Sequence, residues 1–234
     1  MSVILTTFFV VTTFSGNRHF RVIDIFGSSA FSGKRYFRNI NDFEKSIRWR
    51  NFSAGYDVIF LYRSDSSARP FRSRLNLELT GEEFQQIKTE SEIHSTRLRE
   101  VPFTSLAQYL TLLEKCALEI NSKNGTKIIL LAAAVSDFDV CQSANQKIDS
   151  SSSFSEIKLK KVEKVISKLT SSWAPLVATF SFKLETNENL ILKKSEKYFQ
   201  QGVKGVIGNE LLTRRKRIYF ITKNKKIQVN FCKV

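Results

Sequence analysis

A short run of apolar residues near the middle of the chain is the clearest element in the pattern. Four large aliphatic residues stand together at 128–131, three alanines follow at 132–134, and Asp137 and Phe138 come soon after. An apolar run without alternation predicts a strand buried on both faces of a parallel sheet. Ligands of open α/β sheets bind beyond the carboxyl ends of the strands, where small side chains leave room. The pattern predicts a binding crevice here, although a buried strand ended by a capping aspartate would look the same.

Further apolar runs predict more strands around this one. They lie at 2–14, 56–63, 176–182 and 205–208, and two more, at 217–222 and 226–231, flank a short polar turn and predict a hairpin. Strand–helix–strand units form parallel sheets. The predicted fold class is α/β: a three-layer, Rossmann-like, mostly parallel sheet with helices on both faces and an antiparallel C-terminal hairpin at the edge. One domain is expected over 1–234, in which 18–50 is poorly assigned.

Helical patterns separate most of these strands. Ser105 and Gln108 have capping-box spacing, and apolar residues then recur on one face as far as Ile120. Thr186 is predicted to cap a later helix that Gly202 ends. The polar stretch 80–95 is predicted to be a variable helix or lid. One more helix would carry five apolar residues on one face: Val162, Val165, Ile166, Leu169 and Trp173.

Composition narrows the function mainly by exclusion. The formal net charge is +15, but the cations are spread along the chain without a nucleic-acid-binding motif, so a basic nucleic-acid-binding protein receives little weight. The three cysteines are scattered, which predicts neither a disulfide framework nor a zinc site. With only two histidines, a histidine-based metal site or catalytic triad is not expected, and no protein metal ligand is assigned. The segment 2–14 lacks the basic start and cleavage site of a signal peptide and is too short to span a bilayer. A cytoplasmic protein without a membrane partner is expected.

Two amino-terminal loops contain residues suited to binding negative charge. Gly16 follows the first predicted strand, where a glycine lets backbone amides approach a phosphate. Asn51 opens the Asn-Phe-Ser-Ala-Gly loop at 51–55, where an amide among small residues can donate to a carboxylate or an oxyanion, although a plain turn would look the same. This loop leads directly into the strand at 56–63. A parallel connection normally needs about a dozen residues, so either a helix within 36–48 supplies it in altered order or the amino-terminal sequence is divergent or misread.

The motifs that follow the central strand resemble those of a known family. They are Lys147-Ile148, Ile157-Lys158-Leu159-Lys160, Trp173-Ala174-Pro175, Ser181-Phe182-Lys183-Leu184-Glu185-Thr186, Val206-Ile207-Gly208-Asn209 and Leu212-Thr213-Arg214. In this order and spacing they resemble eukaryotic phosphopantothenoylcysteine synthetase (phosphopantothenate–cysteine ligase). The resemblance implies an enzyme of coenzyme A synthesis that joins 4'-phosphopantothenate and L-cysteine through a nucleotide-activated acyl intermediate. It also implies ATP or CTP as co-substrate, Mg²⁺, and a homodimer.

The same resemblance implies catalytic roles for two residues. Asn51 and Lys147 would stabilise negative charge around the acyl phosphate, while the backbone of Ala133 and Ala134 would contact the acyl intermediate. The segment 21–35 resembles the flanks of the family's asparagine loop and is the alternative to the Asn51 loop.

Nucleotide binding would fall to four further residues by resemblance: Asp137, Phe182, Asn209 and Gly16. The family carries two glycines in the loop where this chain keeps Gly16 alone. A chain with this departure could instead be a nucleotide-binding pseudoenzyme or a regulatory partner of an active copy.

Overall fold

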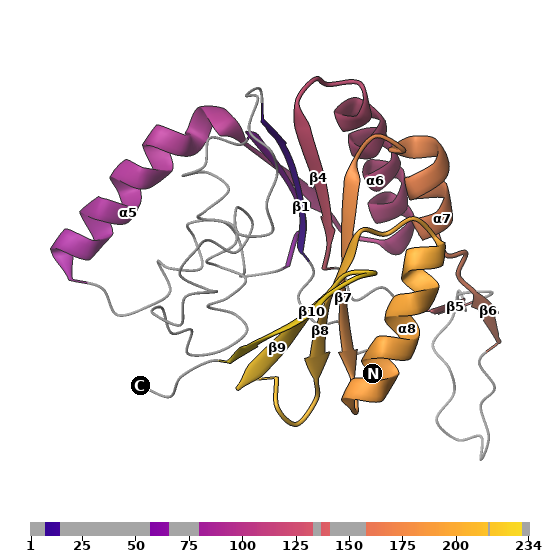
Figure 1. Ribbon diagram of the computed structural model, residues 1–234. Helices are drawn as coiled ribbons and strands as arrows, with labels where there is room; N and C mark the ends of the chain where they lie inside the picture. The colour runs from indigo at the N-terminus through magenta and orange to yellow at the C-terminus, as the bar shows by residue number, and fades with distance from the viewer. Residues whose placement is uncertain are drawn as a thin grey trace, which may run out of the picture.

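The computed structural model of the 234-residue chain describes residues 8–14, 57–65, 80–132, 137–140, 158–214 and 216–230. An eight-stranded sheet runs through the molecule in the order β10-β9-β8-β7-β4-β1-β2-β3 (Figure 1). Its strands are β1 (Phe8–Phe14), β2 (Asp57–Arg63), β3 (Leu98–Phe103), β4 (Thr126–Leu131), β7 (Ala178–Glu185), β8 (Gly205–Glu210), β9 (Arg217–Ile221) and β10 (Lys226–Asn230).

Helices and a small second ribbon complete the described structure. The α-helices are α5 (Gly81–His94), α6 (Leu106–Asn121), α7 (Ile166–Lys168) and α8 (Glu188–Gln200), joined by the 3₁₀ helix η1 (Ser95–Arg97) and the π-helix η2 (Leu169–Trp173). Strands β5 (Phe138–Val140) and β6 (Leu159–Lys161) pair as a separate antiparallel ribbon. Within the described ranges, no helix is both long enough and apolar enough to cross a membrane.

The sheet confirms the predicted fold class. The pairs β2–β3, β4–β7 and β7–β8 are parallel, and the β9–β10 hairpin adds an antiparallel edge. In Figure 1, α6, α7 and α8 lie on one side of the sheet and α5 lies on the other. These layers give the three-layer α/β arrangement expected from the sequence.

Strand β1 differs from the expectation in its direction. It lies between β2 and β4, as a buried first strand should, but it is antiparallel to both. The predicted parallel connection between β1 and β2 is therefore wrong, and antiparallel neighbours need no crossover helix. The segment 36–48, which was expected to supply one, lies outside the described residues.

Packing of α6 against the sheet forms the main core. Ser105 caps this helix by accepting a hydrogen bond from the Gln108 amide at 3.2 Å, which satisfies one of the free amides of the first turn. Its apolar face then buries Leu113 and Ile120 against strand residues such as Ile129. This core fixes β4, whose carboxyl end is part of the predicted crevice.

Several element boundaries differ from the sequence prediction. Asn187, not Thr186, caps α8, because its side chain accepts the Leu190 amide at 3.0 Å. The helix expected from Val162 begins only at Ile166 and continues as the π-helix η2. Strand β7 runs on to Glu185, so Phe182 lies inside the strand rather than at its end.

Burial of Tyr109 predicts that the folded protein loses stability at alkaline pH. Burial raises the pKa of this phenol above its ordinary value of about 10. The protonated phenol is thus favoured in the folded chain, and this stability is fully present below the unfolded pKa and lost as pH rises toward the folded value. We expect Tyr109→Phe to lose less stability than the wild type between about pH 9 and pH 11 in urea titrations. Equal losses would contradict this contribution.

Candidate functional site

Three parallel strands, β4, β7 and β8, point their carboxyl ends toward one edge of the sheet, and β7 and β8 extend four residues beyond β4. In their register Leu131, the last residue of β4, pairs with Ser181, and Leu184 of β7 pairs with Asn209 of β8. This edge corresponds to the carboxyl ends of β4, β7 and β8, where ligands of α/β sheets bind.

Asn209 faces away from helix α8. Its neighbour Gly208 faces Ile191 of that helix so closely that a methyl group added to Gly208 would overlap the Ile191 Cγ2 atom. Successive side chains of a strand point to opposite faces. Asn209 and its register partner Leu184 therefore lie on the other face, together with half-buried Phe182. The structure brings two of the predicted nucleotide-binding residues, Phe182 and Asn209, onto one face of adjacent strands.

The Asn209 side chain has an unmet hydrogen-bonding requirement. The residue is only 8% exposed, and its Oδ1 atom is buried without a hydrogen-bond partner. Buried polar atoms are nearly always satisfied, and leaving one unpaired costs about 1–3 kcal/mol. An acceptor kept in this state at the carboxyl edge is suited to a donor supplied by a ligand.

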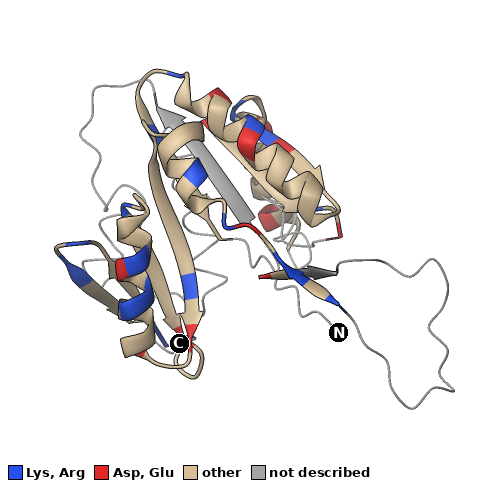
Figure 2. Cartoon of the chain, turned by 90° about the vertical axis from the view of Figure 1, so that its right-hand side faces the viewer, with Lys and Arg blue, Asp and Glu red and all other residues tan. Residues whose placement is uncertain are grey.

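Asp137 lies in a more exposed setting than a crevice floor. Its carbonyl oxygen accepts the Val162 amide at 2.9 Å, and its carboxylate lies 3.9 Å from the Lys164 ammonium. These contacts belong to the β5–β6 ribbon, whose basic strand β6 is visible in Figure 2 from the side that carries α6 and α8. No described contact joins Asp137 to Phe182 or Asn209.

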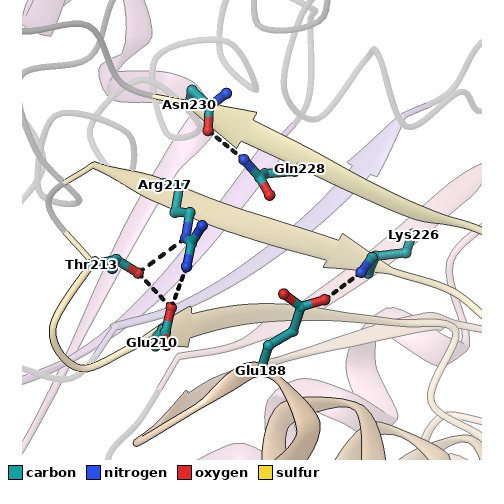
Figure 3. A network of polar contacts seen from close by, with 7 residues as sticks. All are labelled: Glu188, Glu210, Thr213, Arg217, Lys226, Gln228 and Asn230. Carbon is teal, nitrogen blue, oxygen red and sulfur yellow. Dashed lines mark hydrogen bonds and ion pairs between the residues drawn. The ribbon is translucent and has the colours of Figure 1, made fainter.

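A polar network holds the chain immediately after Asn209 (Figure 3). The Glu210 carboxylate accepts hydrogen bonds from the Arg217 guanidinium at 2.7 Å and from the Thr213 hydroxyl at 2.8 Å. The Arg217 Nε–H also donates to the Thr213 hydroxyl oxygen at 3.2 Å. Sequence reasoning missed this network, although an acid at a strand end and a cation at the start of the next strand were its visible signal.

The same network sets the protonation of Glu210. Its bond to Arg217, and then that to Thr213, lowers the pKa of the Glu210 carboxyl below its ordinary value. A group whose folded pKa is lowered contributes stability that is present above the unfolded pKa, about 4.3, and is lost as pH falls through the folded value. The network is therefore intact at neutral pH.

Two contacts that involve lysines join the end of β7 to α8, on the face of the sheet that this helix covers. The Lys183 ammonium lies 4.7 Å from the centre of the Tyr198 ring in α8. The Glu185 carboxylate pairs with Lys194 of α8 at 2.6 Å. These contacts anchor α8 to β7, so the charged residues of the Ser181–Thr186 motif serve packing while Phe182 and Leu184 face the other way.

Five predicted site residues fall on segments that the structure does not describe: Gly16, Asn51, Ala133, Ala134 and Lys147. One nearby observation bears on Gly16. Phe14, where β1 ends, pairs with Thr126, where β4 begins. The direction of β1 thus gives no support for a loop beside the carboxyl end of β4.

A cavity at the opposite edge of the sheet does not belong to this site. It has a volume of about 250 Å³ and is lined by residues such as Asp57, Arg97, Arg99 and Lys123. In the described residues no group of three His, Cys, Asp or Glu side chains could hold a metal ion.

Comparison with known proteins places this geometry in a family. Residues 85–232 match the family described as the DNA/pantothenate metabolism flavoprotein C-terminal domain, which is more than half of the chain. The chain belongs to this family. The flavoprotein C-terminal match begins within α5 and takes in α6, the carboxyl edge of the sheet and the Glu210 network.

Relatives with this domain agree with the resemblance seen in the motifs. The chain is 34% identical to phosphopantothenate–cysteine ligase 1 of Arabidopsis thaliana, over 69% of this chain and 58% of the relative. It is 32% identical to the human phosphopantothenate–cysteine ligase, over 76% of this chain and 66% of the relative. The matches thus span roughly three fifths of the length of these relatives.

Solved structures agree as well. A histidine-to-alanine variant of Cab2 matches with a TM-score of 0.65 at 29% identity, over 77% of this chain and 67% of that one. The same variant in complex with phosphopantothenate-cysteine matches with a TM-score of 0.65 at 27% identity, over 85% of this chain and 73% of that one. The family and fold expected from the sequence are confirmed.

Proposed function

We propose that this protein is a phosphopantothenate–cysteine ligase of coenzyme A synthesis, whose nucleotide-binding edge is formed by β4, β7 and β8. The observation that carries the proposal is the buried, unpartnered Oδ1 atom of Asn209 at that edge, in a chain whose residues 85–232 match the family and which is similar to ligases. The carboxyl group of 4'-phosphopantothenate needs activation, because a carboxylate is a poor electrophile.

The reaction would proceed in two displacements. A carboxylate oxygen attacks the α-phosphorus of ATP or CTP, and pyrophosphate leaves, giving an acyl nucleotidylate. The cysteine amine then attacks the acyl carbon, the nucleoside monophosphate leaves with the bonding electron pair, and the amine loses its proton. No covalent enzyme nucleophile is required.

The residues divide between holding the nucleotide and stabilising charge. Asn209 would bond to the nucleotide through its amide, and Phe182 would stack on the base. Asp137 and Gly16 were also expected on the nucleotide by resemblance. Asp137 would have to exchange its contact with Lys164 for one with the nucleotide. Gly16 follows β1, which ends at the edge of the sheet opposite Asn209. The proposal requires neither Asp137 nor Gly16 to bind the nucleotide.

Charge stabilisation would come from residues that lie outside the described ranges. Lys147 and Asn51 would stabilise negative charge on the acyl phosphate, with backbone contact from Ala133 and Ala134. Mg²⁺ would enter on the triphosphate and offset its charge, with phosphate oxygens and water as its main ligands, as is usual for this ion. The described residues show no carboxylate cluster that competes with this arrangement.

We further propose a cytoplasmic homodimer. The family resemblance implies the dimer, and the β5–β6 ribbon carries one large apolar side chain that is more than half exposed, Leu159 at 56%. An exposed apolar residue on a ribbon is suited to contact with a second copy of the chain. Sedimentation at several concentrations tests the dimer.

The decisive experiment supplies all substrates together. The purified chain is incubated with 4'-phosphopantothenate, cysteine, Mg²⁺ and either ATP or CTP, and amide product and pyrophosphate are measured. Product with one nucleotide supports the ligase. Nucleotide binding without product would indicate a pseudoenzyme, and binding to an unrelated polynucleotide that falls steeply with salt would indicate a nucleic-acid-binding protein.

Asn209→Ala separates a binding role from a structural one. We expect the nucleotide dissociation constant to rise about tenfold, as for loss of a hydrogen bond at the upper end of its net value. The melting temperature of the ligand-free protein should stay level or rise, because the variant removes an unpaired buried acceptor. Asn230→Ala, on exposed β10, is the matched control. A lower melting temperature with unchanged nucleotide affinity would contradict the proposed role.

A further inference from the structure

The residue after Asn209 is bound on the opposite face of the sheet. Gly208 faces helix α8, so Glu210, two residues on, faces the same side, while Asn209 between them faces away. The Glu210 carboxylate is held there by Arg217, the first residue of β9, and by Thr213 in the intervening turn (Figure 3). These bonds thus hold the backbone next to Asn209 from the face of the sheet that α8 covers.

The chain beyond Glu210 is also tied to the strand on the other side. The Leu211 amide donates to the Glu185 carbonyl oxygen of β7 at 2.8 Å. Arg217 attaches the same stretch to β9. Contacts to both neighbouring strands therefore hold the end of β8. The Oδ1 atom of Asn209, just before these contacts, accepts no hydrogen bond.

We propose that Glu210 and Arg217 are positioning residues, which hold the end of β8 so that the Asn209 amide is aimed at the nucleotide. The inference rests on the proposed nucleotide role of Asn209. Neither residue needs to touch the ligand, since a small rotation of the Asn209 peptide would move its amide out of hydrogen-bonding range.

The competing interpretation is that the ion pair only stabilises the hairpin. A second ion pair on the same hairpin provides the matched comparison. Lys226 of β10 bonds to the Glu188 carboxylate at the start of α8, and thereby ties the hairpin to a helix without adjoining Asn209. A purely structural contribution would make the two pairs equivalent.

A double-mutant cycle on nucleotide binding tests the proposal. Titration calorimetry with ATP and with CTP gives the dissociation constants of the wild type, Arg217→Gln, Asn209→Ala, the double variant and Lys226→Gln. We expect Arg217→Gln to weaken binding about tenfold, by analogy with the lower range for loss of a residue that orients a metal ligand. In the Asn209→Ala background the same change should have no further effect, and Lys226→Gln should bind like the wild type.

Two outcomes would overturn the inference. In one, Arg217→Gln weakens nucleotide binding equally in the wild-type and Asn209→Ala backgrounds. In the other, Lys226→Gln weakens binding as much as Arg217→Gln does. If Asn209→Ala binds too weakly to measure, Arg217→Lys replaces it: affinity above that of Arg217→Gln supports positioning through the retained bond to Glu210, and equal affinity contradicts it. A folded wild type that binds neither nucleotide would refute the proposed function itself, which is a different failure from additive effects in a protein that binds.

Discussion

Lys147→Gln is expected to reduce amide formation about 100- to 1000-fold, the size of effect seen when one preorganised charge-stabilising donor is removed. The role proposed for Lys147 rests on the resemblance, and residue 147 lies outside the described residues. The described residues on either side of it, Val140 and Leu159, pair in the β5–β6 ribbon. Val140 is three residues from Asp137 in the sequence.

The measurement separates chemistry from folding. Product formation and pyrophosphate release are followed for Lys147→Gln, and circular dichroism and melting temperature report the fold. Lys168→Gln is the control, because that lysine lies on α7 in an exposed ion pair with Glu163 at 2.8 Å. Lys147→Gln should leave the nucleotide dissociation constant within about threefold of the wild type, since a group acting in the transition state changes kcat more than ground-state binding. Full activity in Lys147→Gln would refute the assignment.

Strong local patterns predicted much of the sheet. The run at 128–131 lies in β4 and is buried at 128–130, and the polar turn at 223–225 joins β9 and β10 as expected. Buried central strands are readable because their apolar runs are uninterrupted. Edge strand β3 was missed, since Arg99, Glu100 and Pro102 interrupt its apolar residues, as is common at sheet edges.

Strand direction was the main feature that the pattern could not supply. The alternation of side chains is the same for parallel and antiparallel neighbours, so the apolar residues of β1 predict a buried strand but not its direction. Pairing with β2 and β4 decides that direction, and those contacts are distant in sequence. The helix expected between β1 and β2 followed from the wrong direction.

In the candidate site too, some features could be predicted from the sequence, and others depend on contacts between distant residues. Asn209 could be found because it ends a buried strand and fits a family motif. Its unpaired Oδ1 atom, however, depends on what surrounds it in space. The partnership of Glu210 with Arg217 likewise depends on the register of the β8–β9 turn, which brings two residues seven positions apart to 2.7 Å. Sequence reasoning found Asn209, and the structure added the bond between Glu210 and Arg217 beside it.

Gly208→Ala is expected to lower the free energy of unfolding by about 3 kcal/mol, the upper range for overpacking a core. A methyl group at Gly208 would overlap Cγ2 of Ile191, a fully buried residue of α8. Helix α8 or the end of β8 must then shift. Because Asn209 is the next residue, nucleotide binding should weaken along with stability.

The control and the rescue both come from the same chain. Gly81, at the start of α5, has no atom within 4 Å of an added methyl group, so Gly81→Ala should be neutral or stabilise by up to about 1 kcal/mol. Ile191→Ala removes the atom that Gly208→Ala would strike. In a double-mutant cycle followed by urea unfolding, the two changes together should cost less than their sum. Additive costs would mean that the effects of the two changes are not coupled. In that case the close approach of β8 to α8 at Gly208 would not be what fixes the backbone beside Asn209.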